Sequence, residues 1–111
     1  MITIMTPTYN RAYALSRLYD SLCQQARWDF EWLVIDDGST DGTAELIFDY
    51  RVKSNFPINY FYKENGGKHR AINEGVVHAT GDWIIIVDSD DLLTCDAVAK
   101  LYNFINHIGT A

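Results

Sequence analysis

Short apolar segments alternate along this chain with longer segments in which apolar residues recur every three or four positions. The apolar segments are the expected strands, Ile2–Met5, Phe30–Ile35, Ile58–Tyr62 and Trp83–Val87. The periodic segments are the expected helices, Tyr13–Gln25, Thr43–Val52, Lys68–His78 and Cys95–His107. Strands that alternate with helices at this spacing form parallel sheets flanked by helices. The predicted fold class is therefore α/β, with a Rossmann-like parallel sheet of about four strands and four helices.

The ends of these elements carry further predictions. Asp41 or Thr43 is expected to cap the second helix, and Thr94 the last one, because their side chains accept bonds from free backbone N–H groups. The strand Trp83–Val87 is apolar at every position, which is typical of a strand buried on both faces.

Length and composition favour one domain, residues 1–111, since 48% of the residues are hydrophobic and no linker or repeat interrupts the pattern. A net charge of −6 without long basic runs argues against a nucleic-acid surface. The longest apolar run is far shorter than the roughly 20 residues of a membrane span, and no secretory leader opens the chain. We expect a soluble, cytoplasmic protein whose Cys23 and Cys95 are free thiols.

Ligands of such sheets bind beyond the carboxyl ends of the strands, so the loops there are the candidate sites. The first is Thr6–Arg11, in which Tyr9 offers a ring on which a flat base can stack. The alternative is a turn whose Thr8 or Asn10 caps the following helix.

The second loop opens with two adjacent carboxylates, Asp36 and Asp37. An ionised carboxylate only accepts hydrogen bonds, so it suits the imide N–H of uracil or thymine, or ribose hydroxyls, better than phosphate. A role of Asp36 in capping the turn is an equal alternative.

The third loop contains paired glycines followed by Lys68, His69 and Arg70 at the start of a helix. Glycines permit close backbone approach, and the basic residues could attract phosphate, although the spacing is not that of a Walker loop. A turn with a solvated basic helix start is the competing interpretation.

The fourth loop, Asp88–Asp91, places three carboxylates within four residues. Mg²⁺ and Mn²⁺ prefer carboxylate oxygens together with substrate phosphates, so a metal-bridged diphosphate is the expected ligand. A solvated acidic turn is the alternative.

Taken together, Thr6–Arg11, Val34–Thr43, Asn65–Gly75 and Asp88–Asp91 resemble, in order and spacing, the motifs of the family 2 glycosyltransferases of GT-A fold. The resemblance implies inverting transfer of a sugar from a nucleoside diphosphate donor, usually a UDP-sugar, to a hydroxyl of a saccharide, lipid or protein acceptor. It also implies a divalent metal, Mn²⁺ or Mg²⁺, held by Asp90 and Asp88.

The residues predicted to bind the nucleotide sugar, Lys68 and Arg70 among them on their local charge alone, are Pro7, Thr8, Tyr9, Asp36, Asp37, Asn65, Gly67, Lys68, Arg70, Asp88 and Ser89. By motif position, Tyr9 lies against the base, Asp37 bonds the uracil imide with Asp36 supporting the loop, and Asp88 lies toward the ribose. Ile72 stands where the family usually has arginine, which makes Lys68 and Arg70 the candidates for the donor's negative charge.

Family members continue past this length into an acceptor region that carries the catalytic base. No catalytic base is therefore expected before Ala111, and the 111-residue chain should bind donor but transfer sugar poorly. The absent part would also cover a sheet edge, so self-association is expected, and it would supply any attachment to the cytoplasmic face of a membrane. The rival hypothesis is a non-catalytic nucleotide-binding or interaction module of Rossmann-like fold.

Overall fold

Parallel strands form the centre of the molecule in the computed structural model, which describes residues 1–109. Residues 110–111 of the expected domain lie outside the described residues. Over the described part, the sheet has four strands in the order β3-β2-β1-β4, all paired in parallel. The strands are β1 (Ile2–Thr8), β2 (Phe30–Asp36), β3 (Ile58–Tyr62) and β4 (Trp83–Ile86). The helices are α1 (Ala12–Cys23), α2 (Thr43–Lys53), α3 (Lys68–His78) and α4 (Ala97–Gly109). The predicted α/β fold class is confirmed.

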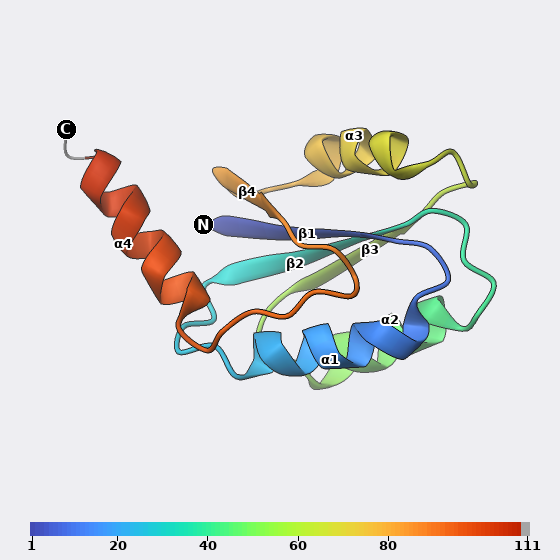
Figure 1. The fold of residues 1–111 in the computed structure, drawn as a ribbon, viewed down its shortest axis with the longest axis horizontal. Helices are drawn as coiled ribbons and strands as arrows, with labels where there is room; N and C mark the ends of the chain where they lie inside the picture. Colours follow the sequence, from blue (N-terminus) through green and yellow to red (C-terminus); the bar gives the residue numbers. More distant parts are fainter. Residues whose placement is uncertain (110–111) are drawn as a thin grey trace.

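The helices cover the two faces of the sheet unequally. Helices α1 and α2 lie on one face and α3 on the other, while α4 projects beside the amino end of β1 (Figure 1). Side chains alternate between the faces along each strand, so Ile4 and Trp32 pack in the core under α1 and α2, whereas Met5 and Leu33 pack under α3. The period-two pattern of β1 and β2 thus builds two cores from one sheet.

Strand β1 continues further than the sequence predicted. It pairs with β2 as far as Thr8, opposite Asp36, although its pairing with β4 stops at Met5. Pro7 lacks an N–H group, and it is tolerated because β1 has only one neighbour beyond Met5. Residues expected in a loop, including Thr8, are therefore fixed by the sheet.

Strand β4 corrects a second expectation. It lies at an edge of the sheet, where Trp83 is 40% and Ile86 47% exposed, so it is not buried on both faces. An apolar run does not distinguish a strand covered on both faces from an edge strand.

The predicted helix caps are also wrong. Helix α2 begins after Gly42, whose φ is 85°, and has no side-chain cap within the described residues. The Asp41 carboxylate instead accepts a bond of 3.0 Å from the N–H of Ala12, at the start of α1. Helix α4 begins at Ala97 rather than Cys95, and the Thr94 hydroxyl donates to the Asp96 carboxylate rather than capping a helix N–H.

Membrane-spanning helices are absent from residues 1–109, where every helix is too short or too polar to cross a bilayer.

Candidate functional site

The order in which strands are added to the sheet changes sides at β1. From β1 the chain winds outward through β2 to β3, and it then returns through α3 to β4 on the other side of β1. Loops that follow β1 and β4 consequently flank a crevice at the carboxyl ends of the strands, where open α/β sheets bind ligands. A cavity of about 310 Å³ lies there. Its lining residues are Pro7, Thr8, Tyr9, Arg11, Asp37, Lys68, Ala71, Asp88, Ser89 and Asp90.

The last residue of β1, Thr8, brings to this cavity a hydroxyl group that has no hydrogen-bond partner among the described residues. Thr8 is 3% exposed, and its Oγ1 has no hydrogen bond to any described residue. A buried hydroxyl without a partner costs free energy, so it is suited to bond a ligand that enters the cavity. Tyr9, the next residue, is 49% exposed and lies at the cavity mouth.

Neither Thr8 nor Asn10 caps α1, which corrects the alternative weighed for this loop. Asn10 instead joins the first two loops: its N–H donates to Ser39 Oγ at 2.8 Å, and its Oδ1 accepts from the N–H of Thr40 at 2.8 Å. Its φ is 50°, in the left-handed region that asparagine tolerates better than most residues. These bonds hold the β1 and β2 loops together at the carboxyl edge.

Asp37 lies deepest among the carboxylates that line the cavity. Its Oδ1 accepts bonds from Lys63 Nζ at 2.7 Å and from the N–H of Gly66 at 2.9 Å, and its Oδ2 accepts from the N–H of Gly67 at 3.0 Å. Burial alone would raise the pKa of Asp37, but the Lys63 ammonium and the two N–H groups hold that pKa below its ordinary value. Asp37 is therefore ionised at neutral pH.

Asp36 lies behind the cavity rather than in its lining. It is 1% exposed, its Oδ1 accepts a bond of 2.9 Å from the N–H of Ser39, and its Oδ2 accepts one of 2.5 Å from the hydroxyl of Tyr60. Burial, and then the bond to Asp36, raise the pKa of Tyr60 far above its ordinary value. Of the two roles weighed for Asp36, the observed contacts are those of a turn support.

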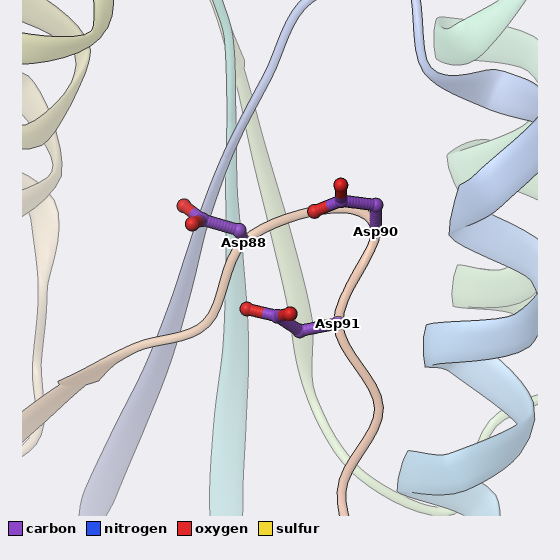
Figure 2. Close-up of side chains that lie close together, drawn as sticks. All are labelled: Asp88, Asp90 and Asp91. Atoms are coloured by element: carbon purple, nitrogen blue, oxygen red, sulfur yellow. The ribbon is translucent and has the colours of Figure 1, made fainter.

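The loop after β4 gathers carboxylates in one place. Asp88, Asp90 and Asp91 extend their side chains to the same side of this loop (Figure 2), and a ligand oxygen from each lies within 4.8 Å of the other two. Lys68 Nζ is 2.7 Å from Asp88 Oδ1, and Arg11 Nη1 is 3.4 Å from Asp90 Oδ2. Carboxylate oxygens at this spacing fit a hard divalent cation, and such a cation supplies charge neutralisation for a diphosphate.

The remaining predicted residues lie at different places. Ser89 is buried in the lining, and Gly67 contributes its N–H to Asp37. Asn65 and Arg70 line a separate cavity of about 360 Å³, between the third loop and α3 residues Asn73 and Glu74. Arg11 also lines the cavity although it was not among the predicted site residues, and its place directly after the Pro-Thr-Tyr-Asn segment is the sequence signal for it. Asp91 was counted among the carboxylates but not among the metal ligands.

Comparison with known proteins decides the family. The model of the family described as Glycosyl transferase family 2 matches residues 3–111. The chain belongs to glycosyltransferase family 2. Among its relatives, an uncharacterised glycosyltransferase of Mycoplasma pneumoniae is 38% identical over 108 residues, which cover 94% of this chain and 36% of the relative. The poly(ribitol-phosphate) beta-N-acetylglucosaminyltransferase TarS of Staphylococcus aureus is 31% identical over 106 residues, which cover 94% of this chain and 18% of that enzyme.

Solved structures of family 2 relatives match the fold. The S. aureus TarS structure in complex with UDP aligns with a TM-score of 0.88 at 29% identity, over 96% of this chain and 32% of that one. The mannosyltransferase PcManGT of Pyrobaculum calidifontis, in complex with GDP-Man and Mn²⁺, aligns with a TM-score of 0.76 at 32% identity, over 82% of this chain and 28% of that one. The predicted family and GT-A fold are thus confirmed, for a chain that spans about a third of each of these two structures.

Proposed function

We propose that this chain is the donor-binding part of an inverting, metal-dependent family 2 glycosyltransferase whose donor is a UDP-sugar. The observation that carries the proposal is the convergence, on one cavity, of an unpartnered buried hydroxyl, an ionised Asp37 and the carboxylates of the β4 loop. S. aureus TarS has been solved in complex with UDP and with UDP-GlcNAc, and PcManGT in complex with GDP-Man and Mn²⁺, which supports a nucleotide sugar here.

The nucleoside would lie against the end of β1, with Pro7 and Tyr9 beside the base and Thr8 Oγ1 bonding it. Asp37 keeps acceptor capacity for an imide N–H, because Oδ2 accepts only one bond from the described residues whereas a carboxylate oxygen offers about two lone pairs. Asp36 would support this loop from behind through its bond to Ser39.

The divalent metal, Mn²⁺ or Mg²⁺, would be held by Asp90 and Asp88, with Asp91 close enough to contribute. When bound, it neutralises charge on the diphosphate as the nucleotide leaves. The protein's own share is to hold the carboxylates in the β4 loop and to place the Lys68 ammonium beside Asp88.

The catalytic base and the acceptor site are proposed to lie in sequence that follows residue 111 in longer family members. General-base catalysis contributes a factor of about 10² to 10⁴, so the 111-residue chain should bind donor and transfer sugar poorly. A saccharide, lipid or protein acceptor, and the cytoplasmic location, stay predictions from the sequence.

Calorimetric titration of the chain with UDP, GDP and TDP, each with Mn²⁺, Mg²⁺ or EDTA, tests the proposal. We expect UDP to bind more tightly with Mn²⁺ than with EDTA, and Asp90→Ala to remove that difference. Asp49→Ala, at an exposed position of α2, is the control that should retain it. Equal UDP affinity with Mn²⁺ and with EDTA would refute the metal site and favour the non-catalytic module. Absence of nucleotide binding would refute the proposed function. Efficient sugar transfer by the chain alone would show that the base lies within it.

A further inference from the structure

Two cations reach the acidic cluster from different elements. Arg11 comes from the loop after β1 and lies 3.4 Å from Asp90, and Lys68, the first residue of α3, lies 2.7 Å from Asp88. The four side chains are between 42% and 57% exposed, and all four residues line the same cavity. Each of the two aspartates proposed as metal ligands therefore already has a basic partner from the chain.

The position of each cation on its helix is electrostatically unfavourable. Arg11 is the N-cap residue of α1 and Lys68 opens α3, yet the amino end of a helix carries partial positive charge and favours anions. Neither helix has an acidic residue in its first turn that would offset this charge. Helix formation alone thus gives no reason for either residue, whereas the carboxylates of the β4 loop do.

A metal ion bound by Asp88 and Asp90 would repel both cations. Ion pairs this exposed contribute little free energy, so they can be broken at small cost. A nucleoside diphosphate that enters the cavity brings new negative charge next to the released side chains. Arginine can bond phosphate oxygens with two N–H groups at once, and lysine acts as a mobile point charge.

We propose that Arg11 and Lys68 are exchangeable counterions of the acidic cluster: they neutralise Asp90 and Asp88 before donor binds, give way to the metal, and then bind the donor's diphosphate. This inference rests on the proposed function, and it adds Arg11 to the donor-binding residues. It also predicts that the two ligands respond oppositely to loss of either cation, because the cation opposes the metal but attracts the diphosphate.

The test measures the two ligands separately in the 111-residue chain. Mn²⁺ alone is titrated and free Mn²⁺ is counted by electron paramagnetic resonance, and UDP is then titrated calorimetrically at saturating Mn²⁺. For Arg11→Ala and for Lys68→Ala we expect Mn²⁺ affinity to rise by about two- to fivefold and UDP affinity to fall by at least a similar factor, the scale of an exposed ion pair. Arg11→Lys should leave the Mn²⁺ affinity close to the wild-type value, without the rise expected for Arg11→Ala, because it keeps the charge.

Arg17→Ala is the matched control, since Arg17 is exposed on α1 and forms no ion pair with any residue from 1 to 109. It should change neither affinity, and circular dichroism checks that every variant is folded. If the wild-type chain binds Mn²⁺ and UDP and both affinities are unchanged in Arg11→Ala and Lys68→Ala, the exchange is overturned while the proposed function stays intact. A parallel loss of both affinities would also overturn it, because it would indicate a positioning role. Failure of the wild-type chain to bind Mn²⁺ would overturn both the metal site and this inference.

Discussion

Lys63 Nζ lies 2.7 Å from Asp37 Oδ1, and this pair joins the end of β3 to the end of β2 beneath the candidate donor cavity. The side chains are 20% and 8% exposed, so the pair is shielded from water far more than the ion pairs of the β4 loop. The third loop is held against Asp37 by the same carboxylate, through the N–H groups of Gly66 and Gly67.

Replacement of Lys63 should therefore destabilise the fold. Lys63→Met keeps the length of the side chain but leaves the Asp37 charge with backbone donors only, and we expect a loss of about 1–3 kcal/mol in the free energy of unfolding by urea. Lys100→Met removes the cation of an exposed pair with Asp96, just before α4, and should cost less than about 1 kcal/mol. Equal losses in the two variants would show that burial does not strengthen the Lys63 pair.

Replacement of Thr8 should affect stability and binding in opposite directions. Thr8→Val removes a buried hydroxyl that has no partner among the described residues, so the free energy of unfolding without ligand should stay constant or rise. UDP affinity should fall by about two- to tenfold, the value of one hydrogen bond, and Thr8→Ser should restore it. If UDP binds Thr8→Val as tightly as it binds the wild-type chain, Thr8 Oγ1 does not contact the donor.

The buried carboxylate of Glu31 should make stability depend on acid pH. Its oxygens accept bonds from Thr3 Oγ1, from the N–H and Oγ1 of Thr80, and from Asn59 Nδ2. Burial alone would raise the pKa of Glu31, but these donors hold that pKa below its ordinary value of 4.5. A lowered folded-state pKa means that the contribution to stability is present above about pH 4.5 and is lost as pH falls through the folded-state value.

Melting temperatures measured from pH 7 to pH 3 test this contribution. Glu31→Gln should be destabilised by about 1–3 kcal/mol at pH 7, because its amide cannot accept all of these bonds, and its melting temperature should fall less steeply below pH 4.5. Glu45→Gln, at an exposed position of α2, should follow the wild-type profile. Parallel profiles of Glu31→Gln and wild type would contradict the assignment.

Gly75 should tolerate a larger residue poorly where α3 crosses β1. A Cβ atom added there would lie 1.7 Å from Met5 Sδ, so Gly75→Ala requires either the buried Met5 side chain or α3 to shift. We expect a loss of about 1–3 kcal/mol from overpacking, which exceeds the gain of roughly 0.5–1 kcal/mol in helix propensity. In a Met5→Ala background the same change should cost much less, and an additive double-mutant cycle in urea would disprove this contact.

The exposed edge at β4 should allow the 111-residue chain to associate. Trp83 and Ile86 are exposed on this strand, and no described strand pairs with its outer side. Sedimentation velocity should show concentration-dependent dimers that Ile86→Lys weakens. A strict monomer at high concentration would refute the association.

Much of the local structure was predictable because it depends on patterns within a few residues. The bounds of β3 and α3 agree with the prediction, and β1 and β2 begin where their apolar runs begin. The carboxylates of the β4 loop are neighbours in the sequence, so their clustering required no knowledge of the fold.

Contacts between distant residues were not predictable in the same way. Asp41 was expected to cap its own helix but bonds the first turn of α1, 29 residues earlier, and Arg11 pairs with Asp90 across 79 residues. The exposure of β4 follows from its place in the strand order, which no pattern within Trp83–Val87 encodes.

By itself, the sequence determined that strands and helices alternate, that polar and acidic segments follow the strands, and to which family the chain belongs, because periodicity and motif spacing are properties of the chain. Only the tertiary structure decided that β4 lies beside β1. That placement brings Thr8, Asp37 and the acidic cluster to one cavity, leaves Asp36 behind it and Arg70 outside it, and supplies Arg11 and Lys68 as counterions. The reason is physical: hydrogen bonds and ion pairs depend on distances between atoms, and packing of the sheet sets those distances between residues that the chain itself keeps far apart.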